Sequence, residues 1–423
     1  MELRERVLAV LRRHWVDIPP GGGYTAPNRG RYPWQWLWDS CFCALIWAEL
    51  GDDRGLDELA QVLGAADAAG CVPHMTYQLD PRHLVDFWGR QGTSSITGPP
   101  MYGHALAELQ RRGAHVPERL VAAAAAGLEF LLHRRERHIE SGLVLLCHPW
   151  ESGADNDPRW DDYCEGGFDE GRWFEAKGKL LGAIERSAGG SPLFNPKFAA
   201  ASAGFSALVA FNALELAEAT GALEPAAAHR LADAVRDRWD GDLCSYTDAG
   251  DAEAGSGRIR TAYGLLGLLV EGDAGRTAAG VAGSPVADRG VVVSGALSGS
   301  GDGRAAAVPG GLLGSVGERA SAVAAELTDP RAYGGAYGPA GVHRAEPAFA
   351  AGSYWRGPSW PQINYLLWLG LRRAGQADAA GTLAQATVAG AVKSGLAEYW
   401  DSDDGTGLGA IPQSWAGLAL LMS

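Results

Sequence analysis

The sequence is poor in basic residues and contains no run of them. Of its 423 residues, 36 are Lys or Arg and 50 are Asp or Glu, which gives a formal net charge of −14. Because nucleic acids and anionic membranes attract basic patches, this balance argues against either as a partner. The first residues, MELRERVLAVLRRHW, also lack the uninterrupted apolar core of a secretion signal. We therefore expect a cytoplasmic protein.

Metal-binding and phosphate-binding motifs are also missing. The six cysteines show neither CxxC spacing nor a paired His motif, so we predict reduced, mostly buried thiols and no zinc site. The acidic run at 401–405 faintly resembles an oxygen-ligand calcium loop, but the later bidentate Glu is absent. The GSGDG at 299–303 has no Lys-Ser/Thr after it, so it does not indicate a phosphate loop. We expect no metal and no cofactor.

Alternating β-type segments are few and short, and the best of them are 144–147 and 290–293. Apolar residues recur instead about every 3.6 positions in many segments, which predicts a mostly helical protein. The predicted helices cover residues 3–15, 38–50, 56–69, 101–112, 117–134, 198–220, 225–239, 259–270, 360–374, 377–394 and 413–422.

The length allows either two ordinary domains or one large barrel. About a dozen helices could not all be buried in a single layer, so we predict an all-α fold in which two concentric layers of helices close into a toroid. No fixed-period repeat of the solenoid type is visible. We expect one domain over residues 1–423. A Gly/Ala-rich excursion at about 273–315 is either a mobile cover over the site or a tolerated insertion.

Tryptophan is abundant, with 15 residues, and several lie beside Asp, Gln, Gly or Pro in segments typical of turns. Indole rings stack on sugar rings while their N–H groups bond hydroxyls, although large residues also simply fill large cores. Helical toroids bring distant connections together at one end, so we predict one shared pocket lined by four segments. They are GRYPWQWLWDSCF (30–42), HPWESGADNDPRWDD (148–162), SYWRGPSWPQINY (353–365) and AEYWDSDDGTGLGAIPQSW (397–415).

The segment 148–162 places five carboxylates around two tryptophans. One interpretation is structural: residues 155–157 satisfy local backbone donors before a proline, and Arg159 pairs with one acid. The other interpretation is catalytic, because glycoside cleavage needs one protonated and one ionised carboxyl. Asp155 suits the acid, since Gly153 permits a sharp turn and Trp150 supplies an apolar wall that raises a pKa. Glu398, at the end of a helix-like run, suits the second role.

Several stretches resemble the bacterial mannosylglycerate and glucosylglycerate hydrolases of glycoside hydrolase family 63: YPWQWLWDSCF, TSSITGPP, HPWESGADNDPRWD, YWRGPSWPQINYLL and AEYWD. That family is related in architecture to the inverting trehalases of family 37. The likeness runs from about residue 20 to the C-terminus and is thin across 220–325. It implies an (α/α)6 barrel and an inverting mechanism, with the general acid at Asp155 and the general base at Glu398. The sugar-lining residues it implies are Tyr32, Trp36, Trp38, Asp39, Trp150, Tyr354, Trp355, Gly357, Trp360 and Gln413.

The chain departs from the family pattern at Gly98, where SITGPP replaces the expected SITQPP and a substrate-facing amide is missing. We predict an inverting α-glycosidase acting on a small α-glucoside or α-mannoside, with glucosylglycerate and mannosylglycerate as the leading substrates. Such anionic substrates would need local cations, for which the candidates are Arg31, Arg90, Lys197 and Arg356. A homo-oligomer is compatible with the sequence.

Two other functions stay open at this point. A sugar epimerase or isomerase could use the same toroid, because a fold does not fix a function. It would need a pair of histidines in the pocket, and His74, His148 and His343 lie near the motif segments without being paired in sequence. A non-catalytic sugar-binding protein could keep the aromatic residues without turnover.

Overall fold

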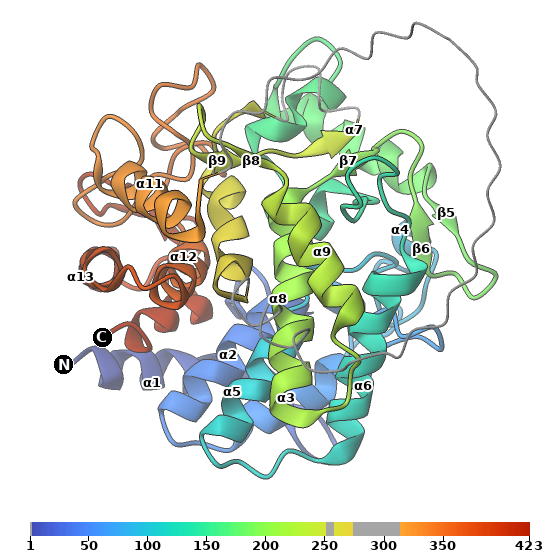
Figure 1. Ribbon diagram of the computed structural model, residues 1–423. Helices are drawn as coiled ribbons and strands as arrows, with labels where there is room; N and C mark the ends of the chain where they lie inside the picture. The colour runs from blue at the N-terminus through green and yellow to red at the C-terminus, as the bar shows by residue number, and fades with distance from the viewer. Residues whose placement is uncertain (1, 251–257, 274–313) are drawn as a thin grey trace, which may run out of the picture.

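The computed structural model describes residues 2–250, 258–273 and 314–423, and it is mostly helical (Figure 1). Each helical segment predicted from the sequence contains a helix, with ends shifted by a few residues. The α-helices are α1 (Leu3–His14), α2 (Leu37–Glu49), α3 (Arg54–Leu63), α4 (Val85–Trp88), α5 (Tyr102–Arg111), α6 (Glu118–Glu129), α7 (Glu170–Gly182), α8 (Ala203–Thr220), α9 (Ala226–Arg236), α11 (Val316–Thr328), α12 (Pro361–Arg373) and α13 (Ala377–Lys393). Shorter or tighter helical segments are η1 (Phe130–Arg134), η2 (Pro149–Ser152), η3 (Pro158–Tyr163), η6 (Ala262–Asp273) and η7 (Ser414–Leu420).

The helices fall into an inner and an outer set. In the inner set, α2 contacts α5, α5 contacts α8, α8 contacts η6, η6 contacts α12, α12 contacts η7, and η7 contacts α2 again. Each inner helix also carries an outer neighbour: α3 packs on α2, α6 on α5, α9 on α8, α11 on η6, α13 on α12 and α1 on η7. The inner helices therefore contact one another in a closed cycle. The two ends of the chain lie side by side (Figure 1).

Apolar patterning explains which helices are inside. Residues 37–47 of α2 and 203–216 of α8 are all buried, and both helices are apolar nearly all round, which is typical of a helix enclosed by others. Outer helix α3 buries a single stripe that includes Leu59, Val62 and Leu63. These two inner helices therefore differ from outer helix α3 in how much of their surface is apolar.

Three helices, α4, α7 and α11, were not predicted. Helix α7 buries only Trp173, Lys177 and Leu180, a narrow stripe among charged residues, so its apolar periodicity is weak. The strand predicted at 144–147 is wrong, because Val144 and Leu145 form only isolated bridges. The strand predicted at 290–293 and most of the 273–315 excursion lie outside the described residues.

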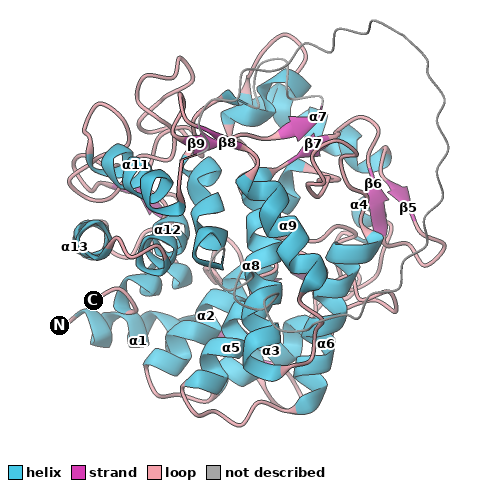
Figure 2. Ribbon diagram, in the orientation of Figure 1, coloured by secondary structure: helices cyan, strands magenta, loops and turns pink. Residues whose placement is uncertain are grey.

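The strands are pieces of two or three residues that pair antiparallel, and several gather with long loops on one side of the molecule (Figure 2). β3 pairs with β4 and β11 with β12, and these two pairs carry residues of the site described below. The strands are β1 (Trp15–Asp17), β2 (Gly23–Thr25), β3 (Gln35–Trp36), β4 (Met75–Thr76), β5 (Glu185–Arg186), β6 (Pro192–Phe194), β7 (Ala200–Ala201), β8 (Trp239–Asp240), β9 (Ser245–Tyr246), β10 (Ala249–Gly250), β11 (Tyr399–Trp400) and β12 (Gly407–Leu408). Among the described residues, no helix is long and apolar enough to cross a bilayer.

A buried carboxyl on α3 makes stability depend on pH. Glu58 is fully buried and accepts a hydrogen bond from the Thr25 backbone N–H at 2.6 Å, and burial raises its pKa from 4.5 to about 8. Between these two pH values the folded chain keeps a proton that the unfolded chain has released. The free energy of unfolding therefore falls as pH rises through this window, by up to about 1.4 kcal/mol per pH unit for this group.

We expect Glu58→Gln to remove this contribution, because the neutral amide keeps the acceptor oxygen and has no proton to lose. Urea unfolding of both proteins at several pH values between 5 and 8 measures the difference. The gap between variant and wild type should widen in favour of the variant as pH rises. Parallel curves would show that Glu58 does not hold a proton in the folded protein.

Candidate active site

A cavity of about 470 Å³ is lined by residues from all four segments that the sequence analysis singled out. It draws on 30–42, 148–162, 353–365 and 397–415, together with residues between 74 and 99 and one residue of α7. The structure therefore brings distant connections together around one space. The predicted site residues that line it are Tyr32, Trp36, Trp38, Asp39, Trp150, Asp155, Tyr354, Glu398 and Gln413.

Three residues expected to line the cavity lie elsewhere: Trp355, Gly357 and Trp360 are not part of its wall. The two indoles are buried and stack on each other with ring centroids 3.7 Å apart. Trp360 also stacks on Tyr399 at 4.4 Å and meets the edge of Tyr354 at 5.4 Å. These rings form a support behind Tyr354. Their sequence context resembles that of the lining residues, so only packing separates the two groups.

The sequence analysis missed part of the wall. The additional lining residues include His74, Met75, Tyr77, Leu84, Phe87, Trp88 and Phe174. Most come from the stretch 74–88. This stretch is rich in aromatic and apolar residues, and that composition could have indicated a part of the cavity wall. Phe174 lies on the unpredicted helix α7 and gave no such signal.

Asp155 lies on a tight loop between η2 and η3. Gly153 adopts a φ of +73°, and a Cβ there would come within 2.6 Å of the Trp38 ring, so the turn needs glycine. The Asp155 side chain is 19% exposed, and its Oδ2 accepts from Lys177 Nζ at 3.1 Å. Lys177 also donates to Asn156 Oδ1 at 2.8 Å. Trp173 Nε1 donates to the Asp155 carbonyl at 2.8 Å, so helix α7 holds the loop through two buried side chains.

The other buried or partly buried acids of this segment belong to ion pairs. Glu151 accepts from both terminal nitrogens of Arg135, at 2.7 and 2.8 Å, and both side chains are fully buried. Asp161 accepts from Arg356 at 2.8 and 2.7 Å. The structural interpretation therefore holds for these acids, and Arg356 is not a free cation.

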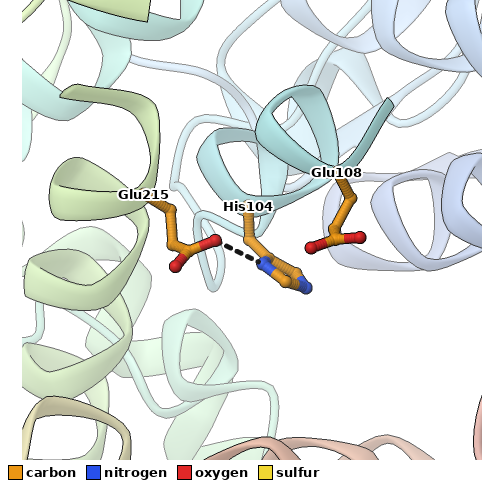
Figure 3. Close-up of side chains that lie close together, drawn as sticks. All are labelled: His104, Glu108 and Glu215. Atoms are coloured by element: carbon orange, nitrogen blue, oxygen red, sulfur yellow. Dashed lines mark hydrogen bonds and ion pairs between the residues drawn. The ribbon is translucent and has the colours of Figure 1, made fainter. Parts of the chain in front are cut away.

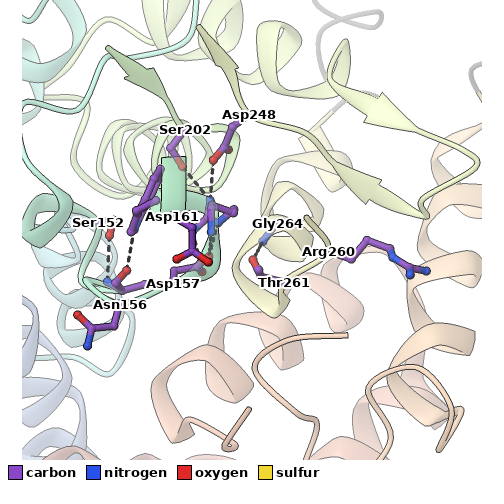
Figure 4. A network of polar contacts seen from close by, with 12 residues as sticks. Ser152, Asn156, Asp157, Asp161, Ser202, Asp248, Arg260, Thr261 and Gly264 are labelled. Atoms are coloured by element: carbon purple, nitrogen blue, oxygen red, sulfur yellow. Dashed lines mark hydrogen bonds and ion pairs between the residues drawn. The ribbon is translucent and has the colours of Figure 1, made fainter. Parts of the chain in front are cut away.

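Behind the loop, Asp157 belongs to a buried polar network that reaches another part of the chain (Figure 4). Its Oδ1 accepts from the Arg159 backbone N–H and from Arg159 Nε, both at 3.0 Å. Arg159 also donates to Asp248 at 2.8 Å, and Asp248 accepts from the Ala203 N–H at the start of α8. This network anchors the loop to the inner helix α8.

Glu398 is 3% exposed and directly precedes β11. Its Oε2 accepts from the Ala410 N–H at 2.8 Å, beside Gly409, where an added Cβ would come within 2.4 Å of the same oxygen. Burial raises the pKa of Glu398. The Ala410 N–H, the charge of Arg31 and a hydrogen bond from Tyr32 work against that shift, and the negative charge of Asp155 adds to it. The two carboxyls therefore influence each other across the cavity.

Other polar atoms of the wall have no protein partner among the described residues. These are Asp39 Oδ1, Gln413 Oε1 and Trp36 Nε1. Burial, followed by the nearby charge of Glu398, raises the pKa of Asp39 well above its ordinary value. Since buried polar groups are normally hydrogen-bonded, such atoms facing a cavity are suited to sugar hydroxyls.

The histidines do not form a pair in the cavity. His74 lines it, and burial lowers its pKa to about 3. His148 lies behind the Trp150 ring, at 4.5 Å between centroids, and burial likewise lowers its pKa to about 3. His343 packs on Tyr333 at 5.2 Å, away from the wall. Among the described residues the arrangement that an epimerase would need is therefore absent.

Two acidic clusters elsewhere are occupied by protein groups. His104, Glu108 and Glu215 lie close together (Figure 3), but Arg111 pairs with both glutamates. Arg373 donates to Glu215 at 2.7 Å, so this cluster is an ion-pair network between α5, α8 and α12. In the run 401–405, Asp401 Oδ1 accepts from the two backbone N–H groups of residues 403 and 404, which is a turn.

Comparison with known proteins identifies the family. The profile described as "Mannosylglycerate hydrolase MGH1-like glycoside hydrolase domain" matches residues 32–289 and 302–416. The chain belongs to this family. It is a glycoside hydrolase. The mannosylglycerate hydrolase of Rubrobacter radiotolerans is 27% identical over 96% of this chain and 94% of that protein, and the glucosylglycerate hydrolase of Mycolicibacterium hassiacum is 34% identical over 31% of this chain and 34% of that protein.

Solved structures show the same fold as this MGH1-like hydrolase. The GH63 mannosylglycerate hydrolase of Thermus thermophilus, in complex with Tris and D-glycerate, superposes with a TM-score of 0.75 at 24% identity, over 100% of this chain and 99% of that chain. The neutral trehalase Nth1 of Saccharomyces cerevisiae superposes with a TM-score of 0.52 at 14% identity, over 96% of this chain and 75% of that chain. The architecture is therefore shared with the trehalases, as the resemblance implied.

The hydrogen bond from Tyr32 gives a test of the Glu398 environment. Tyr32→Phe removes a donor that stabilises the ionised carboxylate, so we expect the titration midpoint of Glu398 to rise. Carbon-13 NMR of glutamate-labelled protein, with Glu398→Gln for assignment, measures it. Tyr77→Phe is the matched control, since Tyr77 lines the cavity but its hydroxyl bonds to Met75 and Trp88. An unchanged midpoint in Tyr32→Phe would contradict the assigned contact.

Proposed function

We propose that this MGH1-like hydrolase is an inverting α-glycosidase in which Asp155 is the general acid and Glu398 the general base. The observation that carries the proposal is that two carboxyls in unlike surroundings line one cavity: Asp155 is partly exposed beside Lys177, and Glu398 is buried beside a backbone N–H. Inverting cleavage of a glycosidic bond requires two carboxyls that flank one substrate site, one as acid and one as base.

In the proposed reaction, Asp155 protonates the glycosidic oxygen as its bond to the anomeric carbon breaks. Ionised Glu398 removes a proton from a water molecule, whose oxygen attacks the same carbon from the opposite face. Lys177 already holds Asp155 Oδ2, which leaves Oδ1 to face the substrate. The lysine ammonium also stabilises the carboxylate that remains after the proton has left.

The surrounding wall supplies the sugar contacts in this proposal. The rings of Trp36, Trp38 and Tyr354 offer apolar surfaces for the sugar ring, while Asp39 and Gln413 offer unpaired oxygen atoms to its hydroxyls. Trp150 forms the wall beside Asp155. Trp355 and Trp360 do not touch the sugar in this proposal and instead hold the Tyr354 ring in place.

The fold and the relatives support the substrate class. The closed cycle of inner helices, with one outer helix on each, supports an (α/α)6 barrel that forms a single domain. Relatives are named mannosylglycerate and glucosylglycerate hydrolases, and structures of the Thermus thermophilus enzyme contain D-glycerate or glucose. We therefore propose a small α-glucoside or α-mannoside as the substrate.

The carboxyl roles predict a loss of turnover without a loss of fold. Asp155→Asn and Glu398→Gln should each lower kcat at least about a hundredfold, because acid or base catalysis contributes that much or more. Steady-state rates of hexose release, with circular dichroism to check folding, measure this. Asp162→Asn is the control, since it changes an exposed acid of the same segment. Near wild-type turnover of Asp155→Asn or Glu398→Gln would show that the substituted residue is not the general acid or base.

Inversion predicts the anomer that is released first. An inverting enzyme needs room for a water between its base and the anomeric carbon, with carboxyls about 6.5 to 9.5 Å apart, whereas a retaining enzyme needs about 5 to 5.5 Å. We expect an α-glycoside to release the β-hexose. Proton NMR spectra recorded before mutarotation decide the point. Initial release of the α-anomer would indicate a retaining mechanism, with Glu398 as the nucleophile.

A further inference from the structure

The mouth of the cavity is unusually apolar for an exposed surface. Seven large apolar side chains among the described residues are exposed, and three of the seven line this cavity. They are Leu84 at 45%, Phe87 at 44% and Phe174 at 65% exposure. By contrast, Asp39, Glu398 and Gln413 are 2 to 3% exposed. The sugar-binding groups are therefore deep, and the apolar residues form the rim.

The rim is held by specific local structure. Leu84 adopts a φ of 55°, a left-handed conformation that is unfavourable for a leucine, immediately before the short helix α4. Helix α4 carries Phe87, whose ring lies 6.2 Å from the ring of Trp150. Gly89, with a φ of 61°, ends the same helix. A strained backbone that displays an apolar side chain at a cavity mouth is typical of a binding surface.

The rim lies on the side of the general acid. Phe174 precedes Lys177 by three positions on α7, so the two side chains share one face of that helix. Lys177 bonds to Asp155, and Trp150 belongs to the same loop as Asp155. Because the acid protonates the departing oxygen, the leaving group lies next to Asp155, between these aromatic residues.

The described cations of this part of the site are already paired with protein groups. Three acids line the cavity, and no Lys or Arg from the described ranges does. Lys177 is committed to Asp155 and Asn156, and Arg90 pairs with Asp67 at 3.2 Å. Arg31 is exposed and lies over the Tyr32 ring, on the Glu398 side. A carboxylate on the leaving group would therefore meet acids without a dedicated cation.

Gly98 also lines the cavity. An added Cβ would meet His74 Cβ at 3.5 Å and Leu37 Cδ2 at 3.6 Å, which is ordinary contact, so the position could accept a side chain that this chain lacks. The missing amide leaves one fewer donor for a polar leaving group and more space for an apolar one.

We propose that the leaving-group side of the cavity takes a neutral, apolar aglycone, such as an alkyl or aryl alcohol, in preference to a carboxylate-bearing one. This inference rests on the proposed α-glycosidase function and narrows its substrate class. It separates this chain from relatives that are named for glycerate glycosides.

The test compares n-butyl and 3-carboxypropyl α-D-glucosides, which differ only in the end of the aglycone. The corresponding pair of mannosides and glucosylglycerate are assayed beside them. We expect kcat/KM to be at least about tenfold higher for the butyl glycoside, since an apolar contact is gained and an unpaired buried charge avoided. Equal or faster cleavage of the carboxypropyl glycoside or of glucosylglycerate would overturn the inference. The clearest such result would be cleavage of a carboxylate-bearing glycoside that is lost in the Arg31→Gln variant.

Substitutions at the rim test whether Phe87 and Phe174 contact the aglycone. Phe87→Ser and Phe174→Ser should each raise KM for the butyl glycoside several-fold and leave methyl α-glucoside cleavage unchanged, because a methyl group does not reach the rim. Leu79→Ser is the matched control, since Leu79 is 56% exposed and does not line the cavity. Equal effects of all three variants would overturn the assignment of the rim.

Failure of the proposed function is distinguishable from failure of this inference. Cleavage of none of the α-glycosides would overturn the function. In that case, calorimetry of glycoside binding to the Asp155→Asn variant decides the aglycone preference. Tighter binding of the butyl than of the carboxypropyl glycoside supports the inference, and the reverse order overturns it.

Discussion

The site depends on a set of ion pairs that neutralise an acidic loop from behind. Buried carboxylates that lacked cations would repel one another and hold protons, and the loop would not keep one shape. Arg135 and Arg356 each bind one acid of the segment 148–162 from another part of the chain, and Arg159, inside the segment, binds Asp157 and Asp248. The loop is thereby held to the protein at several points, and Asp155 is left as the acid that lines the cavity.

The pairing of the other acids with cations also leaves Asp155 and Glu398 in different surroundings. Asp155 contacts an ammonium group and is partly exposed, whereas Glu398 is enclosed and accepts from a backbone N–H. The aromatic residues act on two levels. Some face the cavity, and the stacked pair Trp355 and Trp360 supports the rings that do. Local charge and packing, rather than the net charge of −14, set the chemistry of the site.

Much of the site could be predicted from the sequence because its residues occur in dense, unusual motifs. Segments mixing Trp with Asp, Gln and Gly do not suit helix interiors, so they pointed to connections and to one pocket. The same motifs could not separate Trp36, which lines the cavity, from Trp360, which lies behind it. Both are indoles beside polar residues, and only the direction of each side chain differs. Phe174 was missed for the opposite reason, since it lies among charged residues on a helix with little apolar periodicity.

By itself, the sequence determined the helical class, most helix positions, the family and the two candidate carboxyls, because these follow from local periodicity and from compact motifs. Tertiary structure decided which helices are inner, which acids are paired and which rings face the cavity. Those outcomes depend on contacts between residues far apart in the chain, such as Arg356 with Asp161. The apolar rim is also a tertiary result. Leu84 and Phe87 belong to the α4 region and Phe174 to α7, and only the tertiary structure places all three around one cavity.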